Sequence, residues 1–261
     1  MSDPIIEQST TQNKPRNILS IDIGYHNFGY CILKDFDKTN ESKNINEYLL
    51  FGIFDIDQKL KSSHRKCKTD NRMKCLLEWV DNIVKTHKIS LIIVEQQVKR
   101  NVIAVILQSA VMSYGYLNNI SVYVFSPRKK FSLTNQKFNT KKKEHKKIVQ
   151  VWARELILHY DYDLGNVEIS EDENKIESRI LTEFDLMNKK DDVSDSIIMA
   201  FMLCNFKNWD ESRIKLIFEG KSLKFYHQKK LESSLENSTE PDLTDLKEVL
   251  SKYLTFEIEG N

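Results

Sequence analysis

Four acidic residues of this chain stand where apolar segments begin or end. Asp22 and Glu95 each follow a short apolar run that predicts a buried strand. Asp192 and Asp195 are three residues apart at the start of an apolar helix, so both project from one face. Carboxylates gathered on core elements repel one another unless a cation lies between them, and Mg²⁺ prefers oxygen ligands. The pattern therefore predicts a magnesium site of two ions, for which Mn²⁺ is a possible substitute.

Each of these acids also has an ordinary structural explanation. Asp22 suits a turn at a strand end, and Glu95 suits a solvated strand terminus. Asp192 and Asp195 suit the first turn of a helix, where the macrodipole favours acids. The combination of strand Asp, strand Glu and helical Asp-x-x-Asp is more specific than its parts. Asp191 offers an alternative pairing with Asp195 at a spacing of four, but we prefer Asp192 at i,i+3, which leaves Asp191 as the N-cap.

The elements that position these acids follow from the apolar periodicity. Strands are predicted at 17–23, 28–33, 48–56, 90–95 and 120–125, and helices at 71–87, 101–117, 141–160 and 192–206. The first three strands are spaced as an antiparallel meander, and helices alternate with strands after them. This order predicts an α/β, ribonuclease-H-like domain, in which a mixed five-stranded sheet is flanked by helices. Strand one would lie beside strand four, so Asp22 and Glu95 would meet at one edge of the sheet.

Length and composition set the limits of this domain. The 261 residues, of which 40% are hydrophobic, suffice for one large domain, which we assign to residues 16–210 with an acidic insertion at 161–180. We expect residues 1–15 to be a disordered leader and 211–261 a weakly structured C-terminal extension. No apolar run approaches a membrane span, and the N-terminal segment resembles neither a secretion signal nor a clear mitochondrial presequence. The four cysteines are scattered, which favours an intracellular, non-secreted protein.

Paired metal ions held by carboxylates suit one reaction in particular. Two ions roughly 3.5–4 Å apart activate a water on one side of a phosphate and stabilise the departing 3′-oxygen on the other. We assign Asp22 as the ligand that bridges both ions, with Glu95 and Asp192 or Asp195 completing the separate shells. The predicted reaction is the hydrolysis of a phosphodiester bond.

A dense basic stretch between residues 128 and 147 is hidden by the net charge of +1. It holds nine Lys and Arg residues and one acid, Glu144. Such a stretch in a nearly neutral chain indicates a local contact with a polyanion such as DNA, although a solvated helix face is the alternative. The residues predicted to contact the polyanion are Arg128, Lys129, Lys130, Lys141, Lys142, Lys143, Lys146 and Lys147, and the family resemblance described next implies that this polyanion is DNA.

Five segments resemble RuvC-like Holliday junction resolvases, particularly the poxvirus resolvases and the fungal mitochondrial cruciform-cutting endonucleases. They are IDIGYHNFGYC, IIVEQQVKRN, FSPRKKFS, KKKEHKKIVQVWARELI and KKDDVSDSIIMAF, in the order that the family has them. The resemblance implies a homodimeric, Mg²⁺-dependent endonuclease that resolves four-way DNA junctions by paired, symmetric hydrolysis in recombination, repair or the resolution of genome concatemers. It also implies that Asp22, Glu95, Asp192 and Asp195 occupy metal-ligand positions and that the helix after Glu95 lies near the dimer interface. A fungal member would be mitochondrial, and a viral member would act in the replication compartment of the host cell.

Other functions fit parts of the same pattern. A ribonuclease-H-like nuclease acting on RNA/DNA hybrids or on other branched DNA would have the same metal site. An actin-like or sugar-kinase-like ATP-binding protein also uses an Asp-x-Gly hairpin, but it needs further glycine-rich loops, and this chain has only seven glycines. A non-catalytic DNA-binding relative has no reason to keep all four carboxylates. No membrane and no small-molecule cofactor are expected.

Overall fold

The computed structural model describes residues 17–25, 27–34, 49–61, 68–131, 142–164, 167, 178–203 and 217–218. Side chains are not described at 130, 131, 142–144 and 179. The chain divides into two compact units, Met1–Lys221 and Ser222–Asn261, and every described residue belongs to the first. The leader predicted at 1–15 and the extension predicted at 211–261, apart from 217–218, lie outside the described residues.

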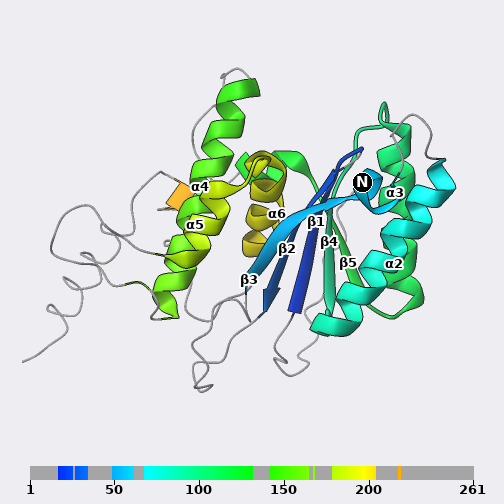
Figure 1. The fold of residues 1–261 in the computed structure, drawn as a ribbon, viewed down its shortest axis with the longest axis horizontal. Coiled ribbons are helices and arrows are strands. Elements are labelled where there is room, and N and C mark those ends of the chain that lie inside the picture. Colours follow the sequence, from blue (N-terminus) through cyan, green and yellow to red (C-terminus); the bar gives the residue numbers. More distant parts are fainter. Residues whose placement is uncertain are drawn as a thin grey trace, which may run out of the picture. The chain divides into compact units, whose positions relative to one another are not determined.

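The centre of the first unit is a five-stranded mixed sheet (Figure 1). Its strands are β1 (Asn17–Ile23), β2 (Asn27–Lys34), β3 (Leu49–Asp55), β4 (Leu91–Glu95) and β5 (Ser121–Phe125). The order across the sheet is β3-β2-β1-β4-β5, with β1, β2 and β3 antiparallel and β4 parallel to both β1 and β5. The predicted ribonuclease-H-like sheet, with its first strand beside its fourth, is confirmed.

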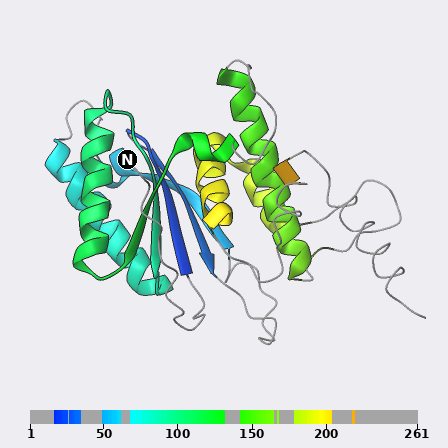
Figure 2. The ribbon, with the colours of Figure 1, turned by 180° about the vertical axis from the view of Figure 1, so that it is seen from behind.

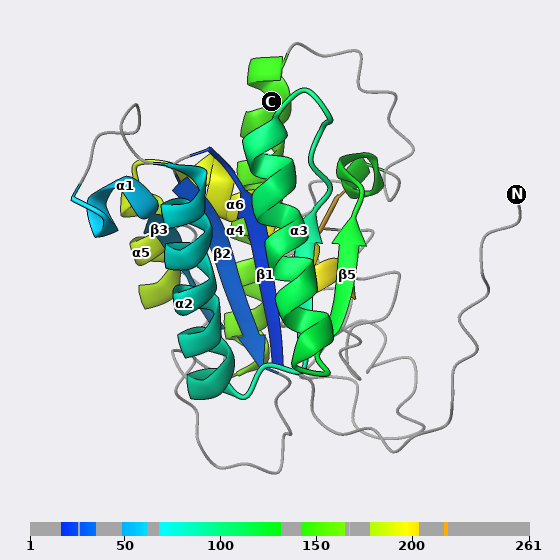
Figure 3. The same cartoon turned by 90° about the vertical axis from the view of Figure 1, so that its right-hand side faces the viewer.

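Helices cover both faces of this sheet (Figures 1 and 2). They are α1 (Ile56–Lys59), α2 (Thr69–His87), α3 (Val102–Leu117), the 3₁₀ helix η2 (Pro127–Phe131), α4 (Lys142–Asp163), α5 (Arg179–Leu186) and α6 (Lys190–Leu203). Figure 3 shows α2 and α3 in front of the sheet and α6 behind it. On that second face α6 lies against β1 and β2, and α4 packs on α6. Among the described residues, no helix is long and apolar enough to cross a membrane.

The alternation of buried residues decides which face of the sheet carries the acids. Leu19, Ile21 and Ile23 of β1 are fully buried in one cluster with residues of α2 and α3. Successive side chains of a strand point to opposite faces, so Asp22 points toward the α6 face. The same rule applies to β4, where Val94 belongs to the α2 and α3 cluster and Glu95 follows it.

Some boundaries differ from those predicted. The third strand ends at Asp55, because Ile56 begins α1, and the segment predicted to be a basic loop begins with η2. The helix α4 continues to Asp163, three residues into the segment interpreted as an acidic insertion, and Asp161 is buried there. Acidic composition indicated an insertion, whereas the Tyr160 hydroxyl donates to the backbone carbonyl of Lys34 at 3.0 Å and ties the end of α4 to β2.

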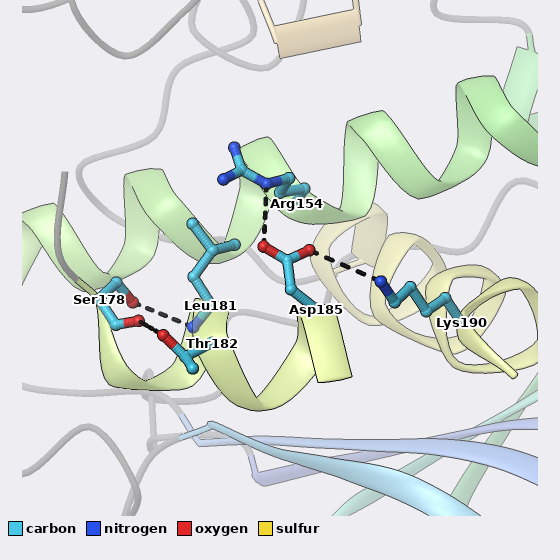
Figure 4. Close-up of polar contacts among 6 residues, drawn as sticks. All are labelled: Arg154, Ser178, Leu181, Thr182, Asp185 and Lys190. Carbon is cyan, nitrogen blue, oxygen red and sulfur yellow. Dashed lines mark hydrogen bonds and ion pairs between the residues drawn. The ribbon is translucent and has the colours of Figure 1, made fainter. Parts of the chain in front are cut away.

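The helix α5 was not predicted, and it connects α4 to α6 (Figure 4). It begins at the N-cap Ser178, whose hydroxyl accepts a hydrogen bond from the backbone N–H of Leu181 at 3.1 Å. Asp185 then pairs with Arg154 of α4 at 3.4 Å and with Lys190 of α6 at 3.9 Å. Exposed ion pairs of this kind contribute only about 0–1 kcal/mol, so they orient the helices more than they stabilise them.

Candidate active site

Asp22 and Glu95 end two neighbouring parallel strands. The register of β1 and β4 pairs Ile21 with Val94, so Asp22 and Glu95 come immediately after the last pair. Both are half-buried, and both point toward the face that carries α6. The carboxyl edge predicted to join these two acids is confirmed by the register.

The first turns of α6 lie directly on this edge. The backbone N–H of Asp22 donates to the hydroxyl of Ser196 at 3.2 Å, and that hydroxyl donates to the carbonyl of Asp192 at 3.2 Å. Gly29, the partner of Asp22 in β2, lies against the same turn, because a Cβ placed there would be 2.1 Å from the carbonyl oxygen of Asp192. The absence of a side chain at Gly29 therefore permits the close contact that brings Asp192 to Asp22.

The pKa of Asp192 is raised above its ordinary value by its surroundings. Burial raises this pKa, and the neighbouring carboxylates of Asp191 and Glu95 raise it further, while Lys146 and Lys189 oppose the rise. Asp192 is thus within electrostatic range of an acid from another element, at the end of β4. Acids that repel one another in a partly buried place form a site where a cation would be favoured.

Lys146 of α4 compensates part of this negative charge. Its ammonium donates a hydrogen bond to Asp191, and this contact raises the pKa of Lys146, as do the charges of Asp192 and Asp195. For Asp191, burial opposes ionisation, but the Lys146 contact and two backbone N–H groups lower the pKa on balance. The interpretation of Asp191 as the N-cap is wrong: α6 begins at Lys190, and Asp191 lies in its first turn.

Asp22, Glu95 and Asp192 come together as backbone positions rather than as a closed set of ligands, and Asp195 lies three residues further along α6. Within the described ranges, no group of three or more His, Cys, Asp or Glu side chains is placed to hold a metal ion. The candidate metal ligands at this edge are nevertheless all carboxylate oxygens, which suit a hard divalent cation such as Mg²⁺. The residue types therefore fit the predicted metal.

The basic residues predicted to contact DNA are only partly described. Arg128 and Lys129 are exposed on η2 beyond β5, and Lys129 donates to the hydroxyl of Tyr123 at 2.6 Å. Lys146 and Lys147 are exposed on α4, where Lys146 is also paired with Asp191. The side chains of Lys130, Lys142 and Lys143, and the whole of Lys141, lie outside the described residues.

Two polar residues at this edge escaped the sequence reasoning. Ser196 is fully buried and joins β1 to α6. In the sequence, the one feature that indicated this role is a hydroxyl residue four positions after Asp192 in an otherwise apolar helix. Lys189 donates to the side-chain oxygen of Asn27, in the amide orientation that also lets Asn27 donate to Asp55 at 3.2 Å. Lys189, the residue before α6, is therefore linked to the start of β2.

Comparisons with known proteins find similar solved structures but no similar sequence. No family model matches the chain, and no curated protein is significantly similar in sequence. Similar solved structures include the yeast mitochondrial Holliday junction resolvase Ydc2, with 15% identity over 78% of this chain and 82% of that chain and a TM-score of 0.48. RuvC of Thermus thermophilus has 13% identity over 70% of this chain and 90% of that one, with a TM-score of 0.41. The fowlpox virus resolvase, solved with Holliday junction DNA, has 16% identity over 71% of this chain and 95% of that chain, with a TM-score of 0.41.

Two of these structures are named as Holliday junction resolvases or their complexes, and the third is RuvC. At such identities and TM-scores, however, similarity does not transfer an activity. The function has to be inferred from the chain's own residues.

Proposed function

We propose that this chain is a divalent-metal-dependent endonuclease that resolves four-way DNA junctions by hydrolysing phosphodiester bonds in two opposing strands. One observation carries the proposal: Asp22, Glu95 and Asp192 come from β1, β4 and α6 and lie at a single edge of the sheet. Carboxylates from three separate elements repel one another and do not stabilise the fold. Their convergence is expected where a cation is used in chemistry.

The metal would be held by Asp22, Glu95, Asp192 and Asp195. Two Mg²⁺ ions bound there would activate water and neutralise charge at the scissile phosphate. The chain's own part is to present the oxygens: β1 and β4 deliver two of them in register, and Ser196 holds α6 so that Asp192 lies beside Asp22. Lys146 balances charge in the same cluster.

The cleavage assay uses a labelled, immobile four-way junction with Mg²⁺, with Mn²⁺ or with EDTA. Paired symmetric nicks are expected with either metal and no nicks with EDTA. A parallel series with an RNA/DNA hybrid, other branched DNA and linear duplex tests the alternative of a ribonuclease-H-like nuclease. Preferential cleavage of the hybrid would replace the junction proposal.

The basic stretch is proposed to bind the phosphates of the junction arms. Lysines that neutralise phosphates release counterions, and each contact contributes about 0.9 to the slope of log affinity against log salt. Replacing Lys141, Lys142 and Lys143 together with Ala is expected to weaken junction binding at least about tenfold and to flatten the slope by up to about 2.7. The measurement is a series of binding titrations at several salt concentrations in EDTA.

The matched control is the double variant Lys74→Ala/Lys85→Ala. These exposed lysines lie on α2, across the sheet from α6 and α4. Their removal is expected to leave the slope nearly unchanged. Equal slopes for the wild type and the Lys141–Lys143 variant would exclude this contact surface.

A homodimer is proposed through the exposed face of α3. This helix contains no charged residue, and Val102 and Ile106 on its surface are 62% and 40% exposed. Tyr116 continues the same face toward the other end of the helix. Ser109 and Ser113 are exposed between Ile106 and Tyr116, so the face is uncharged, with apolar residues toward both ends. An exposed face of this kind favours contact with a second copy, and two-fold symmetry would match the two cuts that a junction requires.

Ile106→Asp is expected to convert the dimer into a monomer, because it replaces an exposed apolar side chain with a charge on a face that has none. Sedimentation or light scattering measures the mass, and the cleavage assay should then show single nicks in place of paired ones. The control is Leu186→Asp, since Leu186 is 77% exposed on α5 and away from α3. A wild type that is monomeric at micromolar concentration contradicts this interface.

A further inference from the structure

Arg72 is a buried cation that the proposed chemistry does not use. It lies on α2 and is only 1% exposed. Its guanidinium donates to the backbone carbonyl of Tyr25 at 2.7 Å and to the carboxylate of Asp57 at 2.9 Å. It also lies 5.0 Å from the centre of the Tyr25 ring, within cation–π range. A buried guanidinium persists only when its donors are satisfied, and here Arg72 contacts both the backbone and the ring of one tyrosine.

Tyr25 lies at the same end of the sheet as the candidate active site. It lies in the turn between β1 and β2, three residues after Asp22. The turn is tight, because a Cβ on Gly24 would be 2.2 Å from the carbonyl oxygen of Asn27. Although its backbone and ring are both held by Arg72, the Tyr25 side chain is 37% exposed. The turn therefore presents an aromatic surface whose orientation is set before any ligand arrives.

We propose that Tyr25 stacks on a DNA base next to the cleaved strand and that Arg72 is the positioning residue that holds it there. The inference rests on the proposed function, since it names a substrate contact of the same site. Every base offers a π-face, so stacking on an aromatic side chain tolerates any sequence. At an open four-way junction the base pairs at the branch point have no stacked base pair on one side, so their faces are accessible. A linear duplex exposes base faces only at its ends. Stacking by Tyr25 would therefore favour branched DNA over duplex.

A fixed aromatic ring gains more from such a contact than a mobile one. A side chain that is already ordered loses little conformational entropy on binding. The guanidinium of Arg72 lies over the ring and supports its orientation, and the hydrogen bond to the Tyr25 carbonyl holds the backbone. Losing Arg72 should consequently weaken DNA binding through Tyr25 and not through charge, because a buried guanidinium does not reach a phosphate.

The first experiment compares Tyr25→Leu with Tyr25→Phe. Both remove the hydroxyl, but only Phe keeps the ring. Dissociation constants are measured in EDTA, where no cleavage occurs, for a four-way junction and for a linear duplex closed by hairpins. Tyr25→Leu is expected to bind the junction about tenfold more weakly, as loss of one stacked base predicts, with an unchanged salt slope and unchanged duplex binding. Tyr25→Phe should stay within about twofold of the wild type.

The second experiment tests positioning with a double-mutant cycle. Arg72→Met keeps the long apolar stem and removes the contacts to Tyr25, and it is expected to weaken junction binding by nearly the same factor. In the Tyr25→Leu background Arg72→Met should add little, because both changes remove one interaction. Asp57→Asn is the control: it removes the carboxylate partner of Arg72 but leaves both contacts to Tyr25, so junction binding should be retained. Circular dichroism checks that each variant is folded.

The outcomes separate this inference from the proposed function. If the wild type neither binds nor cuts junctions, the proposed function fails. If the wild type cuts junctions and Tyr25→Leu binds them as tightly as the wild type, or loses duplex binding equally, stacking by Tyr25 is wrong while the nuclease proposal stands. If Arg72→Met does not fold, the comparison of Leu and Phe at Tyr25 still decides the base contact.

Discussion

Asp22→Asn is expected to lower Mg²⁺-dependent junction cleavage by at least about a thousandfold, which corresponds to roughly 4 kcal/mol of transition-state stabilisation. Asp22 ends the central strand and lies beside Glu95 in register and beside Asp192 through Ser196, so it is best placed to serve both metal ions. Asn keeps the size of the side chain but removes its charge. The backbone N–H that donates to Ser196 is unaffected, so the fold should be retained.

A binding measurement distinguishes lost chemistry from lost structure. In EDTA, Asp22→Asn should bind the junction as tightly as the wild type or more tightly, because one negative charge near the phosphates has been removed. Asp185→Asn makes the same chemical change on α5, at a residue that pairs with Arg154 and Lys190, and should leave the cleavage rate within about twofold. Near-normal cleavage by Asp22→Asn would falsify the proposed metal site.

Gly29→Ala is expected to destabilise the protein by about 3 kcal/mol or more and to abolish cleavage in any protein that remains folded. The added Cβ would lie 2.1 Å from the carbonyl oxygen and 2.4 Å from the carbonyl carbon of Asp192. Both are backbone atoms of α6, so they cannot turn away as a side chain can. The helix itself must move, and Asp192 and Asp195 move with it.

The control for Gly29→Ala is a second glycine of the same sheet. Gly52 of β3 lies against the side chain of Tyr30, whose hydroxyl oxygen would be 2.9 Å from an added Cβ. That ring can shift by a few tenths of an ångström, so Gly52→Ala should cost less than about 1 kcal/mol. Chemical denaturation of both variants gives the comparison. Equal unfolding free energies would show that α6 is not packed as closely on β2 as the structure has it.

Much of the fold follows from local patterns in the sequence. Alternating and continuous apolar runs located the five strands, and helical periodicity located α2, α3, α4 and α6, because burial on one face imposes a period of two or 3.6 residues. The helix α5 was missed because it follows an acidic, polar segment and depends on its Ser178 cap and its contacts with α4 and α6. Local composition does not report contacts of that kind.

The sequence by itself determined which acids are candidates, because it places Asp22 and Glu95 at the ends of apolar runs that form buried strands. Their meeting was decided by the tertiary structure. The hydrogen bond from Asp22 to Ser196 joins residues 174 apart in the chain. Separate elements are likewise connected by the ion pair between Lys146 and Asp191 and by the hydrogen bond from Arg72 to Tyr25. Periodicity shows which side of an element is buried. Only packing decides which distant side chains it is buried against, because that choice depends on the shapes and charges of all the elements at once.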